Sequence, residues 1–93
     1  MRGDGKRQAT LMALFDLEEA VAQDDFKAAQ ECREKRLVLA LDLFRADRKR
    51  HEALQQVWNV SGRWVRHVDP ADRVREALKR AIPLFEKRDP LRD

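Results

Sequence analysis

The sequence predicts an all-α fold, a small antiparallel helical bundle of three to five helices. Three observations lead to this prediction. The 93 residues are 43% hydrophobic and 40% charged, whereas about 25% of an average domain is charged. The chain has one Thr, one Ser and no Tyr, a composition that suits amphipathic helices better than strands. Apolar residues also recur at three- and four-residue spacing, the period of a helix with one buried face.

A chain of this length makes one domain, which we place at residues 8–87. Residues 1–7 carry two glycines among charges and are expected to form a flexible tail, and residues 88–93 a polar one. The first helix is predicted at about 8–23. Its apolar stripe consists of Leu11, Leu14, Phe15, Leu17 and Val21.

Gln23, Asp24 and Asp25 predict a short turn, with one of the two aspartates as the N-cap of the next helix. That helix is predicted at 25–46 and is followed by another at 48–58. We favour a break near Ala46 and Asp47 because residues 45–51 contain a single apolar residue. A single helix over 25–58, about 50 Å long, stays open as the alternative.

The segment Leu37–Phe44 is the most hydrophobic part of the chain, since only Asp42 interrupts its apolar run. A helix that is apolar on nearly every side packs against several neighbours, so this segment is predicted to be the centre of the core. Leu41→Ala should then cost about 2–5 kcal/mol of stability. The candidates for core positions or for partner-binding anchors are Leu14, Phe15, Phe26, Leu37, Leu41 and Phe44.

The clearest turn signal in the chain is the segment 59–62, Asn-Val-Ser-Gly. A last helix is predicted at 70–86, with Asp69 as N-cap and Pro70 at the first helical position. Pro83 is expected to kink or end this helix, because proline removes a helical hydrogen bond.

Catalytic, cofactor and metal chemistry have little support in the sequence, so we expect no enzyme and no cofactor. His51 and His67 lie far apart, and a structural zinc site commonly needs four ligands. Cys32 is the single cysteine, which favours a reducing compartment and a small buried role for its side chain. The apolar run after the basic start is too short for a secretory signal, and no stretch is long enough to span a membrane. A cytoplasmic protein is expected.

The segment 17–39 resembles the UVR-type helical hairpin, found in excision-repair proteins and some stress-protease regulators. Phe26, Ala29 and the pair Arg33-Glu34 fall where that motif has its Phe, Ala and Arg-Asp, whereas Arg36 replaces an apolar residue. The same outline is similar to small flagellar and type III export chaperones. Both resemblances imply protein–protein contacts, although any close antiparallel hairpin would select small residues at these positions.

The segment 54–68 resembles a helix-turn-helix, with Val60 and Ser61 in its turn. The net charge is −2 for residues 1–44 and +5 for residues 45–93, which allows a nucleic-acid partner at the basic half. A loop between two bundle helices is the simpler interpretation. The candidate nucleic-acid contacts are Arg48, Lys49, Arg50, Arg63, Arg66 and His67.

The sequence therefore favours a non-catalytic interaction module, an adaptor or chaperone-like bundle. We expect it to form a homodimer, or to bind another protein's helix in an amphipathic groove. The alternative is a small DNA-binding regulator that uses residues 48–67.

Overall fold

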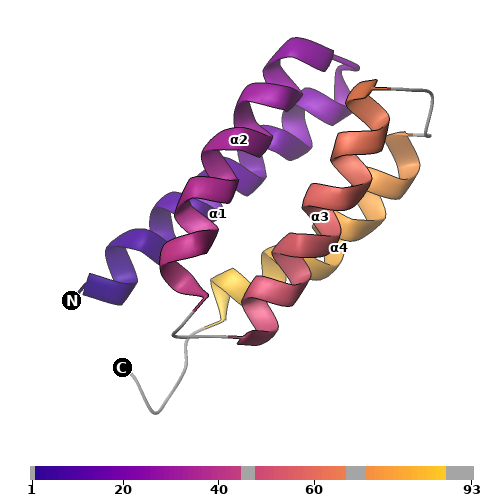
Figure 1. The fold of residues 1–93 in the computed structure, drawn as a ribbon. Coiled ribbons are helices and arrows are strands. Elements are labelled where there is room, and N and C mark those ends of the chain that lie inside the picture. The colour runs from indigo at the N-terminus through magenta and orange to yellow at the C-terminus, as the bar shows by residue number, and fades with distance from the viewer. Residues whose placement is uncertain (1, 45–47, 67–70, 88–93) are drawn as a thin grey trace.

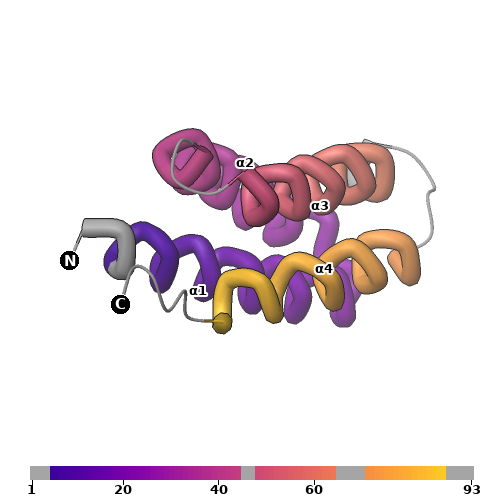
Figure 2. Tube along the Cα trace, turned by 90° about the horizontal axis from the view of Figure 1, so that it is seen from below, coloured from indigo at the N-terminus to yellow at the C-terminus, as the bar shows by residue number. Residues whose placement is uncertain are grey.

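The structure, a computed structural model, describes residues 2–44, 48–66 and 71–87. It contains four helices, α1 (Arg2–Ala22), α2 (Phe26–Leu43), α3 (Arg48–Arg66) and α4 (Ala71–Glu86), and no strand in these ranges. The prediction of an all-α bundle is confirmed. Successive helices run antiparallel, and α1 also packs on α4 (Figure 1). Figure 2 shows α2 and α3 in one layer and α1 and α4 in the other.

The first hairpin turns at the predicted aspartates. Asp24 has a positive φ of 55°, and Asp25 is the N-cap of α2, its Oδ1 accepting a hydrogen bond of 3.0 Å from the Ala28 amide. The prediction for α1 was wrong at its start, because the helix begins at Arg2 rather than near residue 8. An ion pair of 2.6 Å between Lys6 and Asp42 joins this first part of α1 to the end of α2.

The chain breaks between α2 and α3, as the sequence favoured, so residues 25–58 are two helices rather than one. Ala46 and Asp47 lie outside the described residues. The turn predicted at 59–62 is wrong, because α3 runs through this segment to Arg66. Ser61 is fully buried between the core residues Val57 and Trp64, and its hydroxyl donates to the Trp58 carbonyl at 3.3 Å. Packing on both sides of the segment outweighs its weak helix propensity.

The last helix begins one residue later than predicted, and Asp69 and Pro70 lie outside the described residues. Pro83 does not end α4. Ile82 and Phe85, on either side of it, are buried in the core, so packing holds the helix together despite the lost hydrogen bond. Arg50 of α3 donates to the carbonyl oxygens of Leu84 at 2.6 Å and Lys87 at 3.1 Å, and so caps the end of α4.

The core is built mainly by α1, α3 and α4. Its large buried side chains are Leu14, Leu17, Val21, Leu54, Val57, Trp64, Val74, Leu78, Ile82 and Phe85. The inner side of α2 carries Ala29, Arg36, Ala40 and Leu43. The segment 37–44 is therefore not the centre of the core, and the sequence-based prediction was wrong on this point.

Most of the side chains that were predicted as core positions or anchors are exposed or half-buried. Leu41 is 62% exposed, Phe44 43%, Phe26 49% and Phe15 39%, and Leu37 is half-buried. Of the six residues predicted as core or anchors, only Leu14 is fully buried. The physical reason is helical register: residues 29, 36, 40 and 43 share one side of α2, residues 38 and 41 point away from it, and residue 37 lies at its edge.

Candidate functional site

The second half of α2 and its C-cap carry three exposed apolar side chains, Val38, Leu41 and Phe44, beside the half-buried Leu37. We call Leu37, Val38, Leu41 and Phe44 the α2 face. Val38 is the most exposed of them, at 64%. Single exposed apolar residues are normal, but burying a Val, Leu or Phe side chain is worth about 1.5–3 kcal/mol. An apolar cluster on one side of a helix is typical of an interaction surface.

The other exposed apolar side chains lie on α1 or have one ring face covered by another aromatic side chain. Met12 and Phe15 lie on α1, 53% and 39% exposed. The Phe26 ring stacks on Trp64 of α3 with centroids 4.7 Å apart, so one of its faces is covered within the bundle. The Phe44 ring meets His51 of α3 edge-on at 4.1 Å. Phe44 therefore belongs both to the α2 face and to the packing of α2 on α3.

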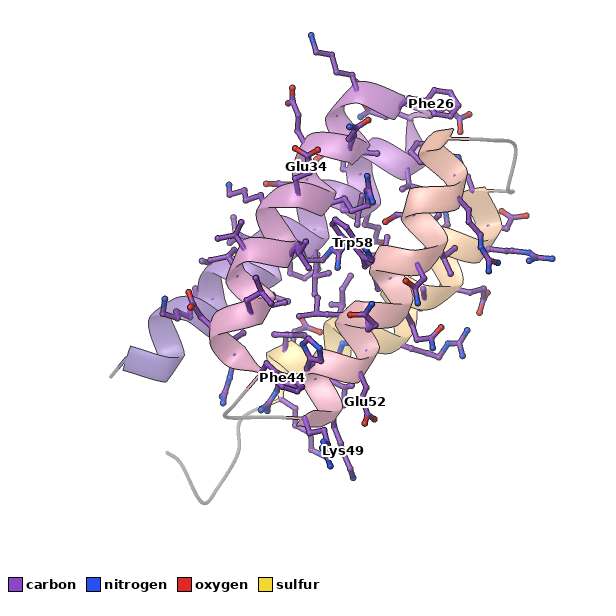
Figure 3. The ribbon with its side chains drawn as sticks, viewed as in Figure 1. Phe26, Glu34, Phe44, Lys49, Glu52 and Trp58 are labelled. Carbon is purple, nitrogen blue, oxygen red and sulfur yellow. The ribbon has the colours of Figure 1, made fainter. Side chains whose placement is uncertain are left out.

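The contact between α2 and α3, the α2–α3 seam, is aromatic and cationic. Besides the two ring pairs, Arg33 lies over the Trp58 ring with its Cζ 4.3 Å from the ring centroid. Arg36 lies by the same ring at 5.4 Å. Figure 3 shows Trp58 between the two helices, with Phe44 at the opposite end of the seam from Phe26. These cation–π contacts lie beside the apolar residues that α2 adds to the core, Ala29, Ala40 and Leu43.

Arg36 is the most unusual residue of the seam. Its side chain is fully buried, and its Nη1 donates a hydrogen bond of 2.9 Å to the Leu54 carbonyl. Its Nε and Nη2 are buried and have no partner among the described residues. Burial, helped by the positive charge of Arg33, lowers the pKa of Arg36 to about 9. A buried charge without a counter-ion is costly.

Sequence reasoning missed the importance of Arg36, although a signal was present. Residues 29, 33, 36, 40 and 43 follow helical spacing and read Ala, Arg, Arg, Ala, Leu. The departure of Arg36 from the apolar residue of the UVR-type hairpin falls on this same stripe. The stripe beside it, residues 37, 41 and 44, is more hydrophobic and therefore suggests the core side of the helix.

The candidate nucleic-acid contacts are only partly grouped. Arg48, Lys49 and Arg63 are exposed on α3, whereas Arg50 is 7% exposed and bonded to α4. Arg50 was therefore wrongly predicted to be an exposed phosphate contact. The Arg66 side chain and all of His67 lie outside the described residues. Because α3 is continuous over 48–66, the turn on which the helix-turn-helix resemblance depends is not formed.

The outer surface between α3 and α4 has two adjoining hollows. Their volumes are about 480 and 310 Å³, and Arg80 lines both. The walls carry charges of both signs, including Lys49, Glu52, Arg73 and Glu76. Among the described residues, the walls of the two hollows hold no Ser, Thr, Cys or His side chain.

The remaining chemistry is limited in the part of the chain that the structure describes. No group of His, Cys, Asp and Glu side chains there could hold a metal ion. Burial raises the pKa of the Cys32 thiol, with Asp16 adding to the effect, so Cys32 is less reactive than a free thiol. None of the described helices combines the length and the apolar character needed to cross a membrane.

Comparison with known proteins gives no relatives for this chain. No family model matches it, and no curated protein or solved structure does so either.

Proposed function

We propose that this protein is a non-catalytic interaction module, an adaptor or chaperone-like bundle that binds a helix on its α2 face and associates with itself. The observation that supports the proposal most is the direction of the apolar residues of α2. The helix places two alanines, an arginine and a leucine toward the core, while Val38 and Leu41 are each more than 60% exposed. An amphipathic helix laid against such a face recovers the free energy of its burial.

The size of the chain also supports self-association. A bundle of 93 residues buries a limited share of its apolar surface, and a second copy can cover what remains. A two-fold axis across α2 would bring the Val38 and Leu41 side chains of two copies together.

The test compares variants that add one negative charge each. We expect the wild type to increase in mass toward a dimer between about 1 and 200 µM in sedimentation experiments, as for a micromolar association. Leu41→Glu and Val38→Glu should remain monomeric with unchanged helical circular dichroism, because a carboxylate on the face cannot be buried unpaired. Gln56→Glu, on exposed α3 surface, is the matched control and should associate like the wild type.

Two results would contradict the proposal. One is equal association of Leu41→Glu and the wild type. The other is a wild type that stays monomeric and binds an apolar dye no better than Leu41→Glu does. The α2 face would then neither self-associate nor bind an apolar ligand.

DNA binding is the second candidate, supported by the exposed side chains of Arg48, Lys49 and Arg63 on α3. Anisotropy of labelled duplex DNA should then fall steeply between about 50 and 200 mM salt, because phosphate contacts release counterions. Arg63→Ala should weaken binding, whereas Lys27→Ala on α2 should not. Absence of binding at low salt would remove this candidate, and equal losses for both variants would reduce it to nonspecific charge attraction.

A further inference from the structure

The free nitrogens of Arg36 form a defined receptor. A guanidinium presents Nε–H and the neighbouring Nη2–H in parallel along one edge, which we call the fork of Arg36. This edge matches the two oxygens of a carboxylate and forms two parallel hydrogen bonds with it. In Arg36 the other nitrogen, Nη1, is held by the Leu54 carbonyl at 2.9 Å. That bond fixes the plane of the group and leaves both atoms of the fork without a partner.

The surroundings of the fork lack an acceptor. Arg36 has no ion pair with any described carboxylate, and the positive charge of Arg33 acts on it unfavourably. The buried Nδ1 of His51, farther along the α2–α3 seam, also has no partner among the described residues. Buried polar groups in proteins are nearly always paired. Arg36 therefore holds a buried positive charge next to that of Arg33, with two nitrogens that no described acceptor fills.

Trp58 and Arg33 are neighbours of Arg36 within the seam. Arg33 and Trp58 are both half-buried, and they contact each other through the ring face at 4.3 Å. Trp58 also lies against Arg36. Rotation of the half-buried Trp58 ring, a motion that takes nanoseconds for exposed side chains, is the route by which a carboxylate would reach Arg36.

We propose that the α2–α3 seam binds a carboxylate on the fork of Arg36, beneath Arg33 and Trp58. A carboxylate carries one negative charge on two coplanar oxygens, so it neutralises Arg36 and fills both donors. An inorganic phosphate dianion would lose more hydration in this aromatic surrounding. The carboxylate belongs either to a free small acid or to an acidic side chain of a bound segment. The second source rests on the proposed function.

The experiment uses the whole protein with sodium acetate, at ionic strength held constant with sodium chloride. We expect a rise in the melting temperature on the order of 5 °C at about ten times the dissociation constant, which continues logarithmically with acetate concentration. The NMR signal of the Trp58 indole N–H should shift over the same concentration range. Arg36→Met should abolish both effects, and Arg36→Lys should weaken them, since lysine keeps the charge and loses the fork. Arg73→Met, at an exposed arginine of α4, is the matched control and should respond like the wild type.

Two capped amino acids separate the sources of the carboxylate. Tighter binding of N-acetyl-glutamate amide than of acetate, with no binding of its glutamine counterpart, would indicate an acidic side chain. Binding of acetate alone would indicate a small free acid. The proposal is overturned if chloride reproduces the acetate effect, if Arg36→Met responds like the wild type, or if the Trp58 signal does not move. Acetate needs no protein partner, so a failure here is distinguishable from a failure of the α2 face to associate.

Discussion

Leu14→Ala is expected to lower the free energy of unfolding by about 2–5 kcal/mol, whereas Leu41→Ala should change it by less than about 0.5 kcal/mol. The two substitutions remove the same atoms, so the difference arises from burial. Leu14 of α1 is completely buried in the core, and Leu41 of α2 is 62% exposed. Urea unfolding followed by circular dichroism measures both values.

The protein concentration matters for the second variant. At about 1 µM, where a micromolar dimer dissociates, Leu41→Ala should be nearly silent. At higher concentration the wild type gains stability from association and the variant gains less. A loss at Leu41 as large as that at Leu14, independent of concentration, would mean that α2 turns its leucine stripe into the core.

The prediction for Leu41 shows where the sequence led to the wrong surface. Hydrophobicity alone marked residues 37–44 as the core, because seven of these eight residues are apolar. Which side of a helix faces inward depends on its neighbours, and the pattern of one helix does not contain them. Ala29 and Ala40 pack inside, where small side chains allow α2 to approach the rest of the bundle closely.

Local signals predicted the bundle well where one residue decides the geometry. Asp25 was one of two predicted N-cap residues. Its carboxylate accepts a hydrogen bond from the Ala28 amide, as an N-cap side chain does. The break between α2 and α3 followed from a polar segment with one apolar residue. Such features depend on a few neighbouring residues, so the sequence carries them.

Predictions failed where tertiary packing outweighs local propensity. The segment 59–62 has the composition of a turn but lies within α3, where Ser61 is buried. Pro83 lies inside α4 because the core holds Ile82 and Phe85. The candidate site could be predicted only in part, since the α2 face was found as a set of residues but assigned to the interior. The stripe that contains Arg36 was a weak signal of its burial, because arginine is almost never fully buried without a partner.

Arg36→Met should make the isolated protein more stable, raising the free energy of unfolding by about 1–3 kcal/mol. Methionine fills a similar length of the seam and carries no charge that must lose its hydration. Two buried donors without partners disappear, and the repulsion between Arg36 and Arg33 disappears with them. The lost hydrogen bond to the Leu54 carbonyl offsets part of the gain. Urea unfolding in chloride buffer, without any carboxylate, measures the difference.

Arg36→Ala is the informative companion, because it removes the same charge but leaves a cavity in the seam. We expect it to be less stable than Arg36→Met, which separates the benefit of removing the charge from the cost of lost packing. If Arg36→Met is instead less stable than the wild type by several kcal/mol, the guanidinium has counterparts that stabilise it in the folded protein. The expected result is that Arg36→Met is more stable than the wild type and no longer responds to acetate. Arg36 would then be a residue that destabilises the folded protein and is needed for carboxylate binding. A stability cost confined to a binding residue is what a site built for a ligand predicts.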